Sequence, residues 1–403
     1  MKMRYGRRMA ILAVNAGSSS LKFALFSSDK LADMVRGELA PIGPDSGATA
    51  TLRTTLPGAT ARRDVGRLPC MGSAVDWLAA YLKAECNHRI TAVGHRIVHG
   101  GTTFRQATLL DEAALQALRD LDALAPLHNP TSRQAVLTLK REMPDAQHVG
   151  VFDTTFHGSL PAKAQRYALP SALYSEHGIR RFGFHGISHG FPAARVATLL
   201  EKPQESLRLI TLHLGNGASV AAIRDGASVD TSMGFTPLEG LVMGTRAGDI
   251  DASIPLYLQA QLGLPASAID TLLNRESGLL ALAGTADMRE IEARRADGDE
   301  AATLAFDLFC YRARKYLGAY LAVLEGADAL VFSGGIGQHS GAVREAICGG
   351  LSRLGVALNS ATNARARADC FVHDASSETA IAVLATDEER EIARQTAVRL
   401  STL

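Results

Sequence analysis

The most constraining feature of this chain is a short pattern that occurs twice. Residues 12–25 (LAVNAGSSSLKFAL) and 210–223 (ITLHLGNGASVAAI) each run from an apolar strand through a polar residue, a glycine and a small polar turn into a second apolar strand. The polar residues Asn15 and His213 coincide when the stretches are superposed. One short match between two hairpins is weak support for a duplication. It nevertheless suggests two similar lobes, each opening with a glycine-turn hairpin, with a ligand between them.

Composition indicates a globular protein of more than one domain. The chain has 403 residues, of which 47% are hydrophobic, so it can bury a large core and divide into two or three domains. Lys and Arg (42) balance Asp and Glu (41), so no overall field favours nucleic acid or an anionic membrane. The five cysteines show no C-x-x-C spacing, which argues against disulfides or a thiolate zinc site and favours a reducing cytoplasm. The apolar run ILAV that follows the basic start is interrupted by Asn15 and Gly17, so we expect a short leader rather than a signal peptide or membrane span.

Short strand patterns alternate with helical ones, which is typical of an α/β protein with partly parallel sheets. Helices are expected over residues 73–85, 111–124, 131–143 behind an Asn129 cap, 188–201 and about 301–325. Residues 40–68 are expected to form a loop or a weak edge strand. Buried strands are expected to end near Asp153, Leu214, Gly335 and Ala385, and each brings a polar or glycine-rich segment to its carboxyl end. Open α/β sheets bind ligands at this end, so these segments are candidate site residues.

The first repeated hairpin has the chemistry of a phosphate site. Small residues let backbone N–H groups approach a phosphate, hydroxyls add donors, and Lys22 supplies a charge. An ordinary hairpin turn is the alternative, although a lone lysine on an apolar strand must either reach solvent or meet an anion. The chain has neither a P-loop nor a G-x-G-x-x-G fingerprint. The string SSLK matches S-x-x-K, but the S-D-N and K-T-G elements that accompany it in penicillin-binding enzymes are absent.

Several charged residues allow both a functional and a structural interpretation. Arg96 lies between apolar residues on an expected strand, where an ion pair and a ligand are about equally plausible. Arg246 lies in a glycine-flanked loop near two aspartates, so a salt bridge is its alternative. Asp153 ends a buried strand and favours a site role. Thr386 and Glu389 match a helix capping box, which by itself explains the acidic residues there. The histidine pairs four residues apart do not have the sequence context of a zinc site.

Taken together, the conspicuous strings resemble the acetate kinase family, the acetate, propionate and butyrate kinases. They are NAGSSSLK, GHRIVHGG, FDTTFH, GFHGISH, HLGNG, GFTPLEGLVMGTRAGDID and GGIG, in this order over nearly the whole chain. The resemblance implies an α/β fold of two duplicated actin-like (ribonuclease H-like) lobes with the active site in the cleft between them. It places the N-terminal lobe at residues 1–152 with 389–403, and the C-terminal lobe, with the dimer interface, at 153–388. It also implies a homodimer, whereas the cytoplasmic location and the lack of a nucleic acid or membrane partner are expected from the cysteines and the charge balance.

The activity implied by the resemblance is reversible, direct in-line transfer of the ATP γ-phosphoryl group to acetate, which gives acetyl phosphate and ADP. Mg²⁺ is the expected metal and Mn²⁺ a possible substitute, and propionate or another short carboxylate is the alternative acceptor. The resemblance makes Arg96, Asp153, His185, Arg246 and His128 catalytic. It assigns the acyl pocket to Val98, Leu127, Phe184 and Pro237 with Arg96, and the metal to Asn15 and Glu388. Phosphate and nucleotide contacts fall on Ser18, Ser20, Lys22, His213, Asn216, Gly217, Asp287, Arg289, Gly335 and Ile336.

Physical reasoning agrees with this assignment. A carboxylate nucleophile has a pKa of about 4 and is already ionised at pH 7, so the reaction needs no general base. It needs cationic groups that bring two anions together and stabilise charge on the transferring phosphoryl group. The chain departs from the family pattern at Gln338 and His339, where Glu-Asn is common, at Ala252, where proline is usual, and at Asp387, where asparagine is usual. All of these positions are expected on the nucleotide or metal side. These departures leave nucleotide preference and metal geometry open.

Other classes remain possible for a two-lobed ATPase. In a sugar kinase Asp153 would be a base toward a hydroxyl, but such an enzyme has no need of a carboxylate clamp at Arg96 and Arg246. A chaperone-like nucleotide switch would need a further substrate-binding domain. A scaffolding role does not account for so many polar residues at strand ends.

Overall fold

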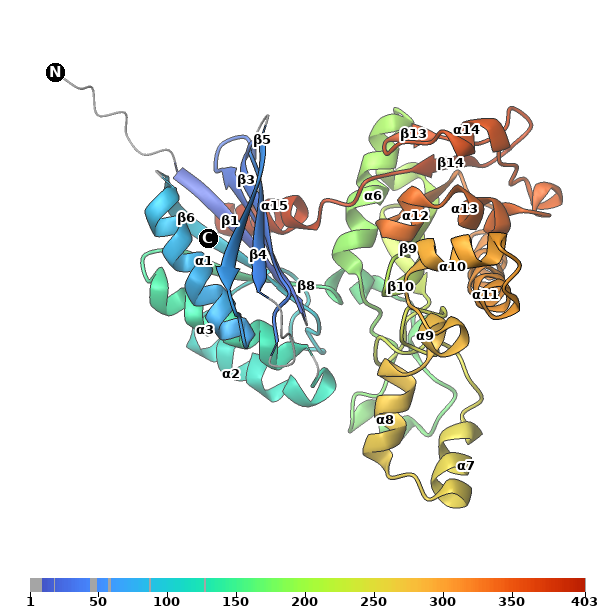
Figure 1. Cartoon of the computed structure of the whole chain (residues 1–403), viewed down its shortest axis with the longest axis horizontal. Coiled ribbons are helices and arrows are strands. Elements are labelled where there is room, and N and C mark those ends of the chain that lie inside the picture. Colours follow the sequence, from blue (N-terminus) through green and yellow to red (C-terminus); the bar gives the residue numbers. More distant parts are fainter. Residues whose placement is uncertain are drawn as a thin grey trace. The chain divides into compact units, whose positions relative to one another are not determined.

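The computed structural model describes residues 9–17, 19–43, 49–56, 59–86, 88–126 and 128–402. It divides into two compact units: unit 1 comprises Met1–Thr155 and Asp387–Leu403, and unit 2 comprises Phe156–Thr386. In Figure 1 the red C-terminal helix α15 accordingly belongs with the blue and green elements of unit 1. The expected lobes had placed Asp153 and Glu388 in the second lobe, whereas this division assigns both to unit 1.

Unit 1 is built on one eight-stranded sheet with the order β5-β4-β3-β2-β1-β6-β8-β7. The strands β2 and β3 extend the sheet from β1 in antiparallel fashion, whereas β6 and β8 run parallel to β1 on its other side. The segment expected to be a loop or weak edge forms β4 and β5 at the sheet edge. The strands are β1 (Met9–Ala16), β2 (Leu21–Ser27), β3 (Asp33–Ala40), β4 (Ala50–Leu56), β5 (Ala59–Gly66), β6 (Arg89–Ile97), β7 (Thr108–Leu109) and β8 (Gln147–Phe152).

Unit 2 repeats this arrangement in a six-stranded sheet with the order β11-β10-β9-β12-β14-β13. Here β10 and β11 are antiparallel additions to β9, and β12 and β14 run parallel to it. The five strands β11-β10-β9-β12-β14 thus reproduce β3-β2-β1-β6-β8 in order and direction. This confirms the predicted α/β fold with two duplicated lobes. The strands are β9 (Arg208–Leu214), β10 (Ala218–Arg224), β11 (Ala227–Thr231), β12 (Ala329–Ser333), β13 (Cys370–Phe371) and β14 (Ala380–Val383).

Helices cover both faces of the first sheet. Leu12, Val14 and Phe23 pack in one core with α1 (Met71–Glu85) and α3 (Asn129–Glu142). On β6, a Cβ at Gly94 would lie only 2.3 Å from Thr396 Oγ1 of α15 (Glu388–Ser401), so this close helix contact requires glycine. The remaining helix of unit 1 is α2 (Glu112–Asp120).

Unit 2 holds most of the helices, several of them short. The long ones are α6 (Gly186–Leu199) and α11 (Glu300–Leu324). The others are α4 (Ala162–Gln165), α5 (Ser171–Ser175), α7 (Ser253–Leu262), α8 (Ala266–Arg275), α9 (Gly278–Ala283), α10 (Met288–Ala296), α12 (Gly334–His339), α13 (Gly341–Cys348) and α14 (Ser360–Ala364). Short 3₁₀ helices occur in unit 1 at Asp122–Leu124 and further along the chain at Thr155–Ser159, Gln204–Ser206 and Ser352–Leu354. No described helix is both long and apolar enough to span a bilayer.

Two predicted helix caps are wrong. His128, not Asn129, precedes α3, and the Asn129 amide instead bonds both backbone groups of His99, at 3.1 and 3.0 Å. At α15 the N-cap is Asp387, whose carboxylate accepts from Arg390 N–H at 3.0 Å, so Thr386 and Glu389 form no capping box. Asn129 has a tertiary partner in His99, and at α15 the neighbouring Asp387 caps the helix in place of Thr386. Sequence spacing reveals neither of these contacts.

Buried neutral histidines make stability depend on pH. His148 Nε2 donates to the Met143 carbonyl at 3.2 Å, so its Nδ1 accepts from His95 Nε2 at 2.9 Å. Burial lowers the pKa of His148 and of His157 to about 4, and it lowers the pKa of His95 and His189 well below the usual value. These imidazoles stay neutral in the folded protein at pH values where the unfolded chain protonates them.

We therefore expect the free energy of unfolding to fall as pH decreases from about 6.5 toward 4, because the unfolded state then binds more protons. The free energy of unfolding is at its full value above pH 6.5. Below that pH it falls by up to about 1.4 kcal/mol per pH unit for each histidine. Urea unfolding at pH 7.5, 6.0 and 5.0 measures this dependence. Equal stability at pH 7.5 and 5.0 would contradict the prediction.

Candidate active site

In unit 1, the first repeated hairpin joins β1 and β2 as the sequence predicts. Gly17 N–H donates to the Ser20 carbonyl at 2.9 Å across the turn, and Asn15 pairs with Lys22 in the strand register. Asn15 is buried, whereas Lys22 is exposed, so the lysine reaches solvent. The predicted phosphate ligand Ser18 lies outside the described residues.

Four predicted site residues form one hydrogen-bonded chain in unit 1. Asp153 receives three contacts from the Arg96 guanidinium, of which the Nη2 contact is 2.6 Å. Arg96 Nη1 donates to Asn15 Oδ1 at 3.0 Å, and Asn15 Nδ2 donates to Glu388 Oε2 at 2.8 Å. The chain Asp153, Arg96, Asn15, Glu388 therefore links the ends of β8, β6 and β1 to the start of α15. Arg96 was expected either to form a structural ion pair or to bind a ligand. It forms an ion pair with Asp153 and also lies among the predicted ligand residues.

Asp153 and Asn15 fix the Arg96 side chain without engaging all of its N–H donors. A guanidinium has five N–H donors, and Nε, one Nη2 hydrogen and one Nη1 hydrogen are taken by Asp153 and Asn15. Counted over the described residues, this leaves one N–H on each terminal nitrogen for an anionic ligand. Burial alone would lower the pKa of Arg96, but Asp153 and Glu388 raise it above its usual value, so the charge persists. Burial raises the pKa of Asp153, and Arg96 opposes this rise.

The start of α15 concentrates carboxylates beside Asn15. Glu389 Oε1 also receives a contact from Asn15 Nδ2, at 3.4 Å. Burial raises the pKa of Glu389, and the neighbouring Glu388 carboxylate raises it further, because two like charges lie close together here. The described residues contain no cluster of three or more metal-ligating side chains. Mg²⁺ is commonly held by only one or two carboxylates with substrate phosphates and water, so the carboxylates of Glu388 and Glu389 fit it.

In unit 2, His185 and Arg246 meet at the second repeated hairpin. His185 precedes α6 with a left-handed backbone (φ 58°), and its Nδ1 lies 2.9 Å from Ser219 Oγ on β10. A Cβ on Gly217, in the hairpin turn, would lie 3.2 Å from His185 Nε2 and 3.8 Å from Arg246 Nη1. The His213 ring lies 4.7 Å from the His185 ring. The structure thus brings together four predicted residues of this unit.

The loop that carries Arg246 is braced by residues that the sequence interpretation missed. Arg246 Nη1 donates to the Pro237 carbonyl at 3.1 Å. Arg181 donates to the carbonyls of residues 231–233 and pairs with Glu239 of the same loop. Tyr167 Oη donates to Glu239 at 2.5 Å and accepts from Phe235 N–H at 2.9 Å. Glu239, which lies inside the conspicuous string GFTPLEGL, was the one residue of this brace that the sequence patterns pointed to.

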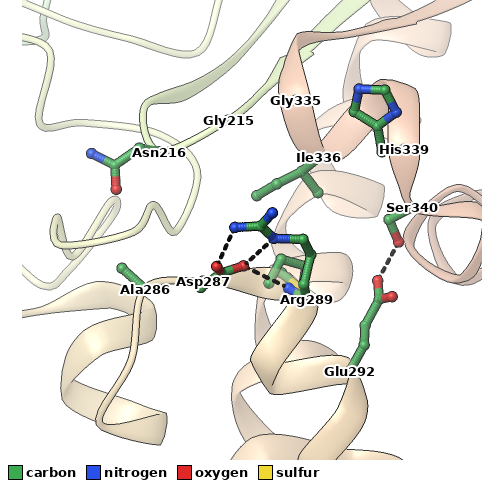
Figure 2. Close-up of a pocket in the computed structure, with 11 residues that line it drawn as sticks. Gly215, Asn216, Ala286, Asp287, Arg289, Glu292, Gly335, Ile336, His339 and Ser340 are labelled. Atoms are coloured by element: carbon green, nitrogen blue, oxygen red, sulfur yellow. Dashed lines mark hydrogen bonds and ion pairs between the residues drawn. The ribbon is translucent and has the colours of Figure 1, made fainter. Parts of the chain in front are cut away.

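A pocket of about 560 Å³ in unit 2 collects five of the ten predicted phosphate and nucleotide residues (Figure 2). They are Asn216, Asp287, Arg289, Gly335 and Ile336. His339, expected on the nucleotide or metal side, also lines the pocket, as do four residues not predicted: Ala286, Met288, Glu292 and Ser340. Gly215 of the hairpin also lines the pocket. Figure 2 shows the hairpin residue Asn216 and the Glu292–Ser340 contact on opposite sides of it. Exposed Arg289 is paired with Asp287 at 2.6 Å.

The predicted acyl pocket is divided between the units. Val98 lies in unit 1 at the end of β6, while Phe184 and Pro237 lie in unit 2, and Leu127 is outside the described residues. His128 stands at the N-cap of α3 in unit 1. A shared pocket of these residues stays a prediction.

The comparisons with known proteins decide the family. A family model described as the acetokinase family matches residues 10–394. The chain belongs to the acetokinase family. The acetate kinase of Syntrophobacter fumaroxidans is 44% identical over 96% of each chain. Among solved structures, a propionate kinase from Francisella tularensis superposes with a TM-score of 0.90 at 36% identity, covering 96% of this chain and 99% of that one. The acetate kinase of Porphyromonas gingivalis gives 0.88 at 37% identity, with 97% and 100% covered.

Membership of the acetokinase family confirms the predicted enzyme class. The protein is a kinase that transfers phosphate to a carboxylate, and acetate kinase is the reading that family and relatives support. The family implies ATP or ADP and a divalent metal as cofactors, with acetate and an acyl phosphate as substrates.

Proposed function

We propose that this acetokinase transfers the γ-phosphoryl group of ATP directly to acetate, reversibly and with Mg²⁺, giving acetyl phosphate and ADP. The observation that supports it most is that each unit presents one arginine with a fixed orientation. Arg96 is oriented by Asp153 and Asn15, and Arg246 by the Pro237 carbonyl of a braced loop. Two such cations serve to gather two anions and to stabilise the charge that develops in transfer.

We propose that Asp153 orients Arg96 and does not act as a base. Its carboxylate is buried, and both of its oxygens accept from the Arg96 guanidinium, which favours an orienting role. A carboxylate acceptor, already ionised at neutral pH, needs no such base. This favours a carboxylate kinase over a sugar kinase, in which a hydroxyl must lose its proton.

Unit 2 supplies the nucleotide side of the proposal. The pocket lined by Asn216, Asp287, Arg289, Gly335 and Ile336 would hold the nucleoside, with the phosphates toward the hairpin at Gly215. His185, fixed by Ser219 and next to Gly217, would donate to the transferring group. His213 and Gly217 would line the phosphate path.

Glu388 and Asn15 are the proposed metal contacts. A bound Mg²⁺ would neutralise phosphate charge and thereby lower the barrier to attack by an anion. Asn15 orients Glu388 through hydrogen bonds to Glu388 and Arg96. Lys22 is exposed on β2 and would contact phosphate. Mn²⁺ is the expected substitute metal, and a cytoplasmic location stays a prediction.

Trapping the acyl phosphate with hydroxylamine tests the function. We expect acetate, ATP and Mg²⁺ to give acetyl hydroxamate, with kcat/KM for acetate above propionate by about 10-fold, since one methylene is worth about 1–3 kcal/mol. Butyrate and glycerol serve as comparison acceptors. A preference for propionate would make the alternative acceptor the correct one. ATP hydrolysis or glycerol phosphorylation without any hydroxamate would overturn the carboxylate kinase assignment.

We further propose a homodimer that forms through α7. None of the ten residues of this helix, all of which the structure describes, is buried. Its apolar side chains Ile254, Leu256, Tyr257 and Leu262, here called the α7 patch, are 42–66% exposed. Several exposed apolar side chains on one short helix are typical of an interaction site. Light scattering after size exclusion should report a dimer for the wild type and a monomer for Leu256→Glu. The exposed Leu169 on another part of unit 2 provides the control Leu169→Glu, which should stay dimeric. A monomeric wild type would refute the proposal.

A further inference from the structure

The N-cap of α15 is tied to β3 by a pair of charges. Asp387 accepts from Arg36 Nη1 at 2.8 Å and from Arg36 Nη2 at 2.7 Å, a bidentate contact between residues 351 positions apart. The same carboxylate caps the helix through Arg390 N–H. Asp387 thus joins the start of α15 to β3.

Two more residues close this pair into a ring of alternating charge. Arg36 Nε donates to Asp33 Oδ1 at 2.7 Å, Arg390 Nε donates to Asp387 Oδ2 at 2.8 Å, and Arg390 Nη2 pairs with Asp33. We call Asp33, Arg36, Asp387 and Arg390 the charge ring. Both guanidiniums lie over the buried ring of Phe26, at 5.3 and 5.2 Å. Arg390 also donates to the Leu31 carbonyl at 2.7 Å, so the ring is anchored to backbone as well.

The charge ring stands directly before the two glutamates of the proposed metal site. The chain returns from unit 2 to unit 1 between Thr386 and Asp387, so Asp387 is the first residue of this segment that unit 1 holds. Glu388 and Glu389 follow in the first turn of α15 and meet the Asn15 amide. Arg36 Nη1 lies 3.9 Å from Glu389 Oε2. The orientation of both glutamates thus depends on how the helix start is fixed.

We propose that Arg36 is a positioning residue for the divalent cation: through the charge ring it fixes the first turn of α15 and so orients Glu388 toward the metal. This inference rests on the proposed role of Glu388. It also explains the departure at Asp387, since an asparagine could cap the helix but could not form the ion pair with Arg36.

Two effects of removing Arg36 act in opposite directions, so the sign of the result is informative. Loss of a positive charge near Glu389 would by itself tighten cation binding. Loss of positioning would weaken it, as removal of outer partners of metal ligands does by about 10–100-fold. The proposal requires weakening by the second effect to exceed tightening by the first.

The test measures Mn²⁺ binding in the presence of ADP by the electron paramagnetic resonance signal of free Mn²⁺. We expect Arg36→Met to raise the dissociation constant by about 10-fold or more. Arg36→Lys should act in the same direction, because it keeps the charge but loses the fork. In turnover, the KM for Mg²⁺ should rise while kcat at saturating Mg²⁺ stays within about twofold, the pattern of lost binding. Asp387→Asn, which keeps the cap, should also weaken binding.

Controls separate this inference from a general loss of structure. Arg53→Met removes a more exposed ion pair with Glu38 between the neighbouring strands and should leave Mn²⁺ binding unchanged. Thermal unfolding of each variant reports its folded state. Unchanged or tighter Mn²⁺ binding in Arg36→Met, with weakened binding in Glu388→Gln, would overturn the role of Arg36 alone. Normal binding in Glu388→Gln would overturn the metal assignment of Glu388 and the inference with it.

Discussion

Replacing Arg96 by lysine should reduce kcat/KM for acetate by about 10²–10³-fold, the loss typical of removing one transition-state donor. Lysine keeps the charge but replaces a planar fork by a point charge, so it cannot hold Asp153 and Asn15 while presenting two N–H groups to a substrate. The measurement is the hydroxamate assay over a range of acetate concentrations. Near wild-type kcat/KM in Arg96→Lys would rule out the fork at this position.

Lysine is preferred to alanine at this position for a physical reason. Asp153 is 1% exposed, and removing its cation would leave a buried charge without a partner, at a cost of about 3–5 kcal/mol. Arg96→Ala could therefore fail by misfolding. Asp153→Asn gives the complementary variant: if Asp153 only orients Arg96, this change should lower activity less than Arg96→Lys does. Arg141→Lys, on an exposed ion pair of unit 1, should leave activity unchanged.

Arg246→Lys should produce the second large effect, a decrease in kcat of about 10²–10³-fold. Arg246 contacts the Pro237 carbonyl and lies near His185 at the hairpin turn, so we expect it to act on the transferring phosphoryl group. An interaction made mainly in the transition state lowers kcat more than it raises KM. Steady-state kinetics with ATP and acetate varied separately distinguishes these parameters.

The brace of the Arg246 loop offers a graded comparison. Glu239→Gln keeps the shape of the side chain but removes the charge that pairs with Arg181. It should lower kcat in the same direction as Arg246→Lys and by a smaller factor, because the arginine itself remains. Arg195→Lys changes an exposed ion pair with Asp369 in the same unit and should have no effect. A rise in KM for acetate with kcat unchanged in Arg246→Lys would contradict the assignment.

The repeated hairpin was predictable because it is local. Apolar alternation and a glycine turn specify β1 and β2, and again β9 and β10, within 14-residue stretches. The duplication of the whole sheet was less accessible. The strands that continue it, β6 and β8 or β12 and β14, lie far along the chain, and only their pairing revealed the shared order.

The family, the fold class and the polar residues at strand ends and turns follow from local strings such as HLGNG and GGIG, which are legible in the sequence alone. Which of those residues contact one another follows only from the folded chain. Asp153 holds Arg96, Asn15 joins Arg96 to Glu388, and Arg36 meets Asp387 across 351 positions. The physical reason is that ion pairs and hydrogen bonds act over about 3 Å and depend on direction. Whether two distant residues meet these conditions is settled only when the backbone that carries them has folded.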